Sequence, residues 1–160
     1  VATAESGAVF ADPGDRQTFL RCKLNLDERQ SNQASYRLHQ DLLRVRREDE
    51  TINTPSRLDG AVLSEQAFVL RFFAAHGDDR ILVVNLGVDL WYNPAPEPLL
   101  APLYEHGWAI QWSSESPDYG GSGTAPLETN ANWIVPGESA VLLRPHENGE
   151  LSDAPVSQKN

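Results

Sequence analysis

The sequence predicts a mainly β protein: an antiparallel β-sandwich over residues 56–146, preceded by one α-helix over residues 31–48. After Pro55 the spacing of apolar residues changes from about 3.6 residues, typical of a helix, to about two residues, typical of a strand. The segments with the shorter spacing are brief, and Pro and Gly separate them, which is typical of antiparallel sandwiches and barrels rather than parallel sheets. Apolar and aromatic residues also gather between Leu58 and Leu143, where a core can form.

One apolar stripe predicts the helix. Four residues recur at spacings of four, four and three, which places them on one helical face. Ser31 or Asn32 is expected to cap the N-terminus, and the arginines of residues 44–47 oppose the negative end of the helix dipole. The helix is expected to end before the polar linker "EDETINTPS", which contains Pro55. The stripe consists of Ala34, Leu38, Leu42 and Val45.

Six short segments are predicted to be strands because they alternate or are rich in β-branched and aromatic residues. The second and third are joined by the turn sequence "HGDDR" and should form a hairpin. Residues 93–102 contain four prolines, which cannot donate to a sheet, so this segment is expected on the surface or along a sheet edge. The predicted strands are residues 57–63, 67–74, 81–87, 89–92, 108–112 and 139–145.

The two ends of the chain carry little periodicity. Residues 1–30 are expected to form an extended lead-in, with turn chemistry in "ADPGD". Residues 147–160 have almost nothing apolar to bury and are expected to be a disordered tail. The chain begins with Val1 and contains no Met, so we expect it to be a piece of a longer polypeptide.

Charge and cysteine content restrict the partners and the compartment. The net charge is −10 and the pI about 4.7, which argues against nucleic acid or an anionic membrane as a partner, although surplus acids also simply solvate a surface. A single cysteine, Cys22, allows no internal disulfide and predicts a reducing, cytoplasmic location. The sequence shows neither a membrane-spanning apolar run nor a signal peptide.

The titratable residues form no recognisable catalytic or metal-binding pattern. No histidine has a Cys, His or carboxylate partner at metal-ligand spacing, and Cys22 lacks a nucleophile signature. Glycoside hydrolysis uses two facing carboxylates, but the sequence does not pair any of those present. We therefore assign no catalytic residue, no cofactor and no metal ligand. The histidines are His39, His76, His106 and His146.

The segment "QWSSESPDYGGSGT", residues 111–124, is either an aromatic platform for a sugar or a loop that joins two strands. It is not a phosphate loop, because it lacks the necessary Lys and no helix pattern follows it. Trp108, Ile110 and Trp112 share one face of the predicted strand, which favours core burial for at least two of them. Tyr119 is balanced between core and platform.

Several motifs in a fixed order resemble one enzyme family. Residues 12–25, "DPGDRQTFLRCKLN", and the helix sequence "HQDLLRVRRED" resemble the end of the catalytic barrel of the malto-oligosyltrehalose trehalohydrolases, in the α-amylase superfamily. The segments "RILVVNLGVDL" and "PAPEPLLAP", with residues 110–145, are similar to the C-terminal β-domain of that family. The resemblance covers residues 10–146.

The resemblance implies a retaining glycoside hydrolase with a (β/α)₈ barrel that cleaves an α-1,4 bond and releases trehalose from maltooligosyltrehalose. Its catalytic carboxylates lie on barrel loops, and no residue of this chain matches their motifs. The helix would be the last barrel helix, and the barrel would be the partner of the β-domain. The family's Ser-Lys-Leu-Asp-Trp segment reads "CKLNL" here, with Asn25 and Leu26, which leaves a glucan branching enzyme or another amylase relative as an alternative.

Three functional hypotheses follow. The first is a structural C-terminal module that is inactive alone. Without a barrel to cover it, the apolar stripe of its helix would allow two copies to form a homodimer. The second is an α-glucan-binding module, which requires at least two exposed, coplanar rings. The third is an interaction domain unrelated to sugars. The candidate sugar-stacking residues are Trp91, Tyr92, Trp112 and Tyr119.

Overall fold

The computed structural model describes residues 11–92, 97–102, 106–129 and 132–147. The chain divides into two compact units, Val1–Gln33 and Ala34–Asn160. No helix in the described part of the chain is long and apolar enough to cross a membrane.

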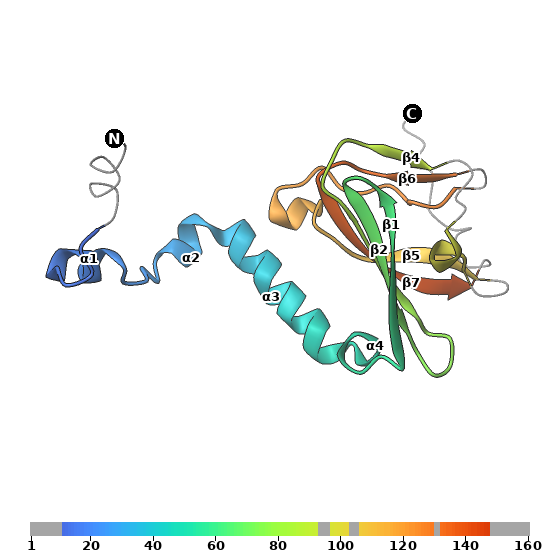
Figure 1. Cartoon of the computed structure of the whole chain (residues 1–160), viewed down its shortest axis with the longest axis horizontal. Helices are drawn as coiled ribbons and strands as arrows, with labels where there is room; N and C mark the ends of the chain where they lie inside the picture. Colours follow the sequence, from blue (N-terminus) through green and yellow to red (C-terminus); the bar gives the residue numbers. More distant parts are fainter. Residues whose placement is uncertain (1–10, 93–96, 103–105, 130–131, 148–160) are drawn as a thin grey trace, which may run out of the picture. The chain divides into compact units, whose positions relative to one another are not determined.

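The first unit is partly helical, which corrects the extended lead-in expected for residues 1–30. It contains α1, Arg16–Arg21, and α2, Glu28–Ser31 (Figure 1). The Asp15 side chain caps α1 by accepting a hydrogen bond from the backbone N–H of Gln17. Neither helix has a buried residue. Such short helices carry no apolar stripe, and the sequence therefore gave no periodic signal for them.

The long helix α3, Gln33–Glu48, confirms the main helical prediction, but its ends differ from those expected. Ser31 is the last residue of α2, and Asn32 is the C-cap of α2, so neither acts as the predicted N-cap of α3. The expected polar linker contains a further short helix, α4, Glu50–Asn53. Asp49 separates the two helices and caps α4 through its side chain, which accepts a hydrogen bond from Ile52 N–H.

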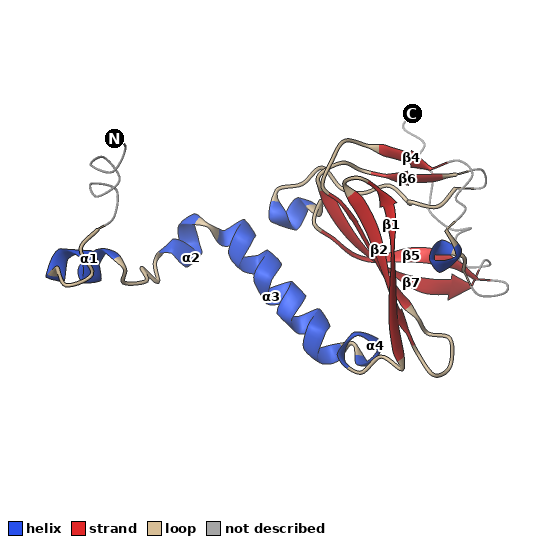
Figure 2. Cartoon of the chain, viewed as in Figure 1, coloured by secondary structure: helices blue, strands red, loops and turns tan. Residues whose placement is uncertain are grey.

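In the described residues, seven antiparallel strands form two sheets, which confirms the predicted mainly β fold (Figure 2). The larger sheet has the order β1-β2-β3-β7-β5, and the smaller one pairs β4 with β6. All six predicted strands are present with small boundary shifts; the prediction missed β6, which has only three residues. The strands are β1 Arg57–Ser64, β2 Ala67–Phe73, β3 Arg80–Asn85, β4 Leu90–Tyr92, β5 His106–Ser113, β6 Trp133–Val135 and β7 Ser139–Glu147.

The core lies on one face of the larger sheet, called the inner face. Val69, Val83 and Val141 form one row across β2, β3 and β7, and none of them is exposed to solvent. Trp133 and Val135 of the smaller sheet belong to the same cluster, so this is a two-layer sandwich core. The remaining buried apolar members are Leu63, Ala67, Ile81, Leu100, Trp108, Leu127 and Leu143.

The proline-rich segment also contributes to this core, contrary to the expected surface or edge position. Within it, the short 3₁₀ helix η2, Pro98–Leu100, places Leu100 in the cluster with only 2% exposure. The buried Arg71 guanidinium donates to the carbonyl oxygens of Leu99 and Ala101, at 3.1 and 2.7 Å. Residues 93–96 lie outside the described part. So does nearly all of the expected tail, apart from Glu147, which ends β7.

Candidate functional site

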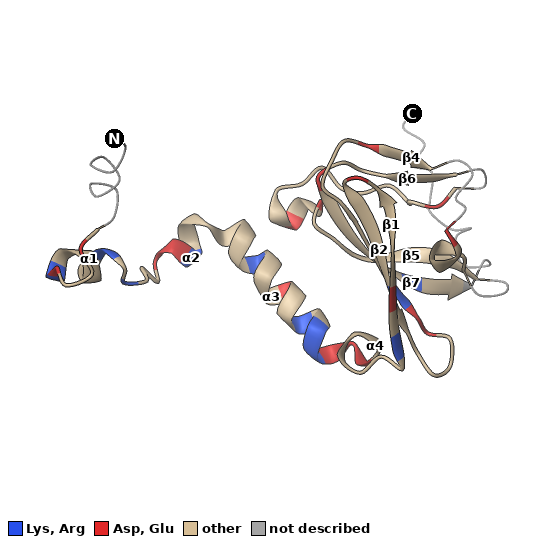
Figure 3. Cartoon of the chain, viewed as in Figure 1, with Lys and Arg blue, Asp and Glu red and all other residues tan. Residues whose placement is uncertain are grey.

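The opposite, outer face of the larger sheet is unusually apolar. An antiparallel sheet with one face in water normally alternates between apolar and polar residues. Here the outward positions of β1, β2, β3 and β7 carry mostly apolar side chains that are exposed or half-buried, and only Leu142 among them is buried. These strands carry few charges along their length (Figure 3). The outer face comprises Leu58, Val62, Phe68, Leu70, Phe72, Leu82, Val84 and Leu142.

A β-bulge brings Trp112 to this outer face. The register of β5 against β7 shifts between Ile110 and Trp112, so that Ile110 pairs with Leu143 and Trp112 pairs with Leu142. The predicted shared face of Trp108, Ile110 and Trp112 is therefore wrong for Trp112. Trp108 is buried as expected, and Ile110 packs against the core. The extra residue is Gln111.

Helix α3 contacts the outer side through a stripe that differs from the predicted one. Its half-buried residues recur at spacings of three, four and four, and two of them are aspartates. Ala34 and Leu42 of the predicted stripe are exposed, Leu42 by 38%. The half-buried stripe is Leu38, Asp41 and Val45 of α3, followed by Asp49 directly after the helix.

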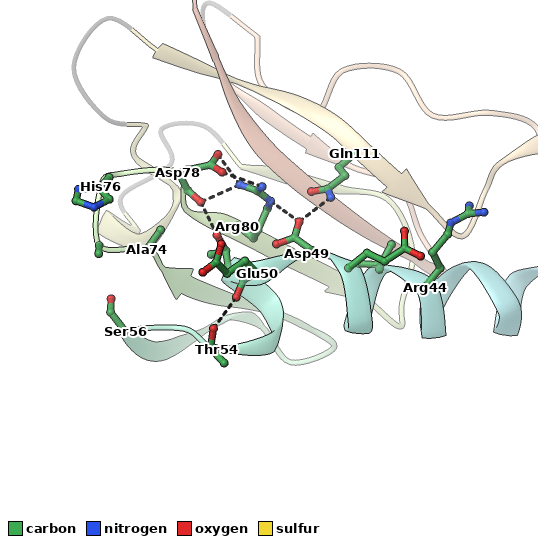
Figure 4. A pocket seen from close by; sticks show the side chains of 14 residues that line it. Arg44, Asp49, Glu50, Thr54, Ser56, Ala74, His76, Asp78, Arg80 and Gln111 are labelled. Atoms are coloured by element: carbon green, nitrogen blue, oxygen red, sulfur yellow. Dashed lines mark hydrogen bonds and ion pairs between the residues drawn. The ribbon is translucent and has the colours of Figure 1, made fainter.

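Asp49 joins the end of α3 to the sheet (Figure 4). One carboxylate oxygen accepts hydrogen bonds from Arg80 Nε and Gln111 Nε2, both at 2.8 Å. Asp78 binds the other side of the same guanidinium, at 2.7 Å. The side chains of Asp49 and Arg80 are only 5% and 11% exposed, so this pair is largely removed from water.

The pKa values of this pair follow from its surroundings. Burial by itself raises the pKa of Asp49, but the hydrogen bonds from Gln111 and Arg80 outweigh it and leave the pKa below its usual value. Burial also acts to lower the pKa of Arg80, while its bonds to Asp78 and Asp49 more than reverse this effect and raise it. Both groups are therefore held in their charged forms.

A second polar contact joins the middle of α3 to the loop after β5. Tyr119 ends the 3₁₀ helix η3, Pro117–Tyr119, and its hydroxyl donates to Asp41 at 2.7 Å. The same hydroxyl accepts a hydrogen bond from Trp112 Nε1 at 3.1 Å. Burial, together with the bond to Asp41, raises the pKa of Tyr119. Nearby, Arg37 of α3 forms an exposed ion pair with Asp118 at 2.9 Å.

Two hollows lie along α3, one on either side of Gln111. The first has a volume of about 730 Å³ and includes Asp49, Arg80 and His76 in its lining (Figure 4). The second has a volume of about 480 Å³ and is lined partly by Trp112 and Tyr119. Arg44, Val45 and Gln111 line both hollows, so the two adjoin.

The four candidate sugar-stacking residues do not form one platform. Trp91 is 66% exposed on β4, whereas the adjacent Tyr92 packs against the core. Trp112 and Tyr119 are half-buried, and their rings lie 6.2 Å apart at an angle of 40°. The structure thus brings together only the last two, in a tilted rather than coplanar arrangement.

The remaining titratable residues are dispersed. Cys22 is an exposed free thiol, and the His39 ring bonds to the carbonyl of Ser35 within α3. Both ring nitrogens of His146 are buried without a hydrogen-bond partner. In the described part of the chain, no group of three or more His, Cys, Asp or Glu residues could hold a metal ion.

The polar contacts of Asp49 were not predicted from the sequence. Asp49 falls in the segment interpreted as a linker, and its partners Arg80 and Gln111 are 31 and 62 residues away. A capping aspartate before "ETIN" was a recognisable local signal for α4. No local pattern could indicate the two long-range partners, because these contacts depend on how the sheet is assembled.

Comparisons with known proteins place this architecture in a family. The family described as "Domain of unknown function (DUF3459)" matches residues 55–142, more than half of the chain, and the chain belongs to this family. A malto-oligosyltrehalose trehalohydrolase of Deinococcus radiodurans is 38% identical over 87 residues. That match covers 52% of this chain but only 14% of the relative. No solved structure matches. The two findings support an α-amylase-family C-terminal region.

Proposed function

We propose that this chain is the C-terminal β-domain of a glycoside hydrolase similar to malto-oligosyltrehalose trehalohydrolase, and that its role is structural. The parent enzyme would hydrolyse the α-1,4 bond that releases trehalose from maltooligosyltrehalose. Family membership and the similarity to the Deinococcus enzyme support this proposal. The catalytic carboxylates would belong to the barrel, and the β-domain would stabilise that barrel by packing against it.

The apolar outer face is the observation that carries this proposal. Burying an apolar side chain such as Leu or Val contributes about 1.5–3 kcal/mol. Several such side chains on the outer face are exposed or half-buried. Burying them would add a free energy that is large compared with the net stability of a domain, which is about 5–15 kcal/mol. Leu58 and Val62 are 53% and 77% exposed. A covering partner explains why these outward positions are not polar.

Helix α3 supplies the second part of the proposed interface. Its contact with the sheet side is largely polar, while three apolar side chains remain exposed by 38–54%. A helix on the outside of a barrel needs such apolar side chains to pack against neighbouring barrel elements. Asp49 would then hold the last barrel helix at a fixed position relative to the β-domain. The three exposed residues are Tyr36, Leu42 and Leu43.

A chimera tests the docking proposal. In the Deinococcus trehalohydrolase, the matching segment is exchanged for the corresponding residues of this chain. We expect the chimera to release trehalose from maltooligosyltrehalose, whereas the 160-residue chain alone releases none. The double variant Leu58→Ser, Val62→Ser should lower the melting temperature of the chimera by several degrees and leave that of the isolated chain nearly unchanged.

A matched control distinguishes docking from a general loss of apolar surface. Val88 and Trp91 are 85% and 66% exposed, and Trp91 lies on the smaller sheet. The double variant Val88→Ser, Trp91→Ser should leave the melting temperature of the chimera unchanged. Equal effects of both double variants, or trehalose release by the isolated chain, would refute the proposal. Any genomic sequence upstream of Val1 tests the branching-enzyme alternative, because the barrel motifs of branching enzymes differ from those of trehalohydrolases.

A further inference from the structure

We propose that the smaller hollow, beside Trp112 and Tyr119, binds a short neutral oligosaccharide. This site would be separate from any catalytic site in a barrel and would belong to the β-domain together with α3. The choice of an α-linked glucan as ligand rests on the function proposed above, whereas the preference for a neutral polyol rests on the hollow itself. The isolated chain should therefore bind such a ligand without a barrel.

The aromatic side chains are held in place before any ligand arrives. Trp112 donates from Nε1 to the Tyr119 hydroxyl, which in turn donates to Asp41 of α3. This chain of hydrogen bonds fixes both rings between the sheet and the helix. Because the rings are already ordered, binding would cost little further side-chain entropy. Both are half-buried and line the hollow. Because the two rings are tilted by 40° and do not form a flat platform, one sugar ring would stack on Trp112 alone and meet Tyr119 at its edge.

The charges around the hollow are balanced, which favours a neutral ligand. Its two carboxylates each have an arginine partner: Asp41 pairs with Arg44 at 2.6 Å, and Asp118 pairs with Arg37 at 2.9 Å. Neither a phosphate nor an ammonium group would therefore meet a net opposite charge. The same planar groups present several donors and acceptors, which suit the adjacent hydroxyls of a sugar.

Hydroxyl groups and available space complete the site. Ser116 and Thr124 also line this hollow. The Thr124 hydroxyl bonds to that of buried Ser113 at 2.6 Å, and the Ser116 hydroxyl accepts from Asp118 N–H, so these groups are oriented and keep only their remaining hydrogen-bonding capacity for a ligand. Its volume of about 480 Å³ lies within the range of about 300–1,000 Å³ that is usual for small-molecule sites. The adjoining hollow of about 730 Å³ shares Gln111 and extends the available space along α3. A chain of two or three sugars fits this description better than a single ring.

Maltotriose binding to the isolated chain tests the proposal. In nuclear magnetic resonance titrations up to about 10 mM maltotriose, we expect the indole N–H resonance of Trp112 to shift and that of Trp91 to stay in place. Trp112→Leu should weaken binding by about tenfold, through loss of the ring contact. Trp91→Leu, at an exposed position on the other sheet, should leave the affinity unchanged.

Three results would overturn this proposal. They are no response of wild-type Trp112 to maltotriose, an equal loss of affinity in Trp91→Leu, and binding of a tetralysine peptide in place of the sugar. The wild-type resonance measurement decides the matter even if Trp112→Leu does not fold. If the sugar-binding proposal fails, the docking proposal remains intact. The chimera measures docking through Leu58 and Val62, which do not line the hollow.

Discussion

The two faces of the larger sheet use similar residues in different surroundings. On the inner face, Val69, Val83 and Val141 are completely buried beneath the smaller sheet and the η2 segment. On the outer face, Val84 and Leu70 occupy equivalent alternating positions and remain half-exposed. Residue type alone therefore does not distinguish core from surface in this sheet. The difference lies in what covers each face.

The two buried arginine pairs repeat this contrast. Arg71 on the inner face bonds to Asp79 at 2.9 Å and to two backbone carbonyls, so it fastens a loop over the core. Arg80 on the outer face bonds to Asp49 and Asp78 and fastens the end of a helix. The inner pair adds to the apolar contacts that Leu100 already makes with the core, whereas the outer pair joins a helix whose contacts with the sheet at this end are polar. On the outer face, the Asp49–Arg80 ion pair attaches the end of α3 to the sheet, where apolar packing would normally hold a helix.

The strongest test of this comparison uses two adjacent valines of β3. Val83 is fully buried on the inner face, and Val84 is half-buried on the outer face. Val83→Asp should abolish cooperative folding, because an unpaired charge would be buried without compensation. Val84→Asp should remain folded, with a melting temperature lower by only a few degrees. Circular dichroism melts of both variants measure the difference, and similar melts would mean that the outer face is as well packed as the inner one.

The second test concerns the polar attachment of α3. Asp49→Ala removes one of the two carboxylate partners of Arg80, the one that is buried, together with the cap of α4, and it should cost about 3 kcal/mol of unfolding free energy. Asp118→Ala removes the partner of Arg37, where both side chains are more than half exposed, and should cost about 0.5 kcal/mol or less. Urea denaturation measures both values. Equal losses would show that the Asp49 contacts contribute no more than a surface ion pair.

The sequence predicted the inner face better than the outer one, for a physical reason. β-Branched and aromatic residues along β2, β3 and β7, bounded by turn residues, are a local signal, so these strands, the hairpin and the sandwich class were predictable. The bulge that turns Trp112 outward adds one residue to β5, and the change is visible only in its pairing with Leu142. The helix stripe was misassigned because Asp41 contacts the loop after β5 and Asp49 contacts the sheet through hydrogen bonds, which apolar periodicity does not detect.

The smallest expected effect is a pH dependence of the attachment at Asp49. Its pKa in the folded chain lies below that of an unfolded aspartate, which is about 3.9. Asp49 therefore adds stability at every pH above that value, and the contribution disappears as the pH falls through its folded-state pKa. Asp49→Asn keeps the size of the side chain but cannot ionise. The variant should be less stable than the wild type near pH 7.

The difference between the two proteins should then narrow as the pH falls below about 4. Denaturation curves collected between about pH 7 and pH 2 measure this, and all other carboxylates cancel because both proteins carry them. A difference that stays constant with pH would mean that charge at Asp49 does not hold α3 to the sheet. In that case the difference would come from the uncharged hydrogen-bond geometry toward Arg80 and Gln111, since Asn can still cap α4 by accepting from Ile52 N–H.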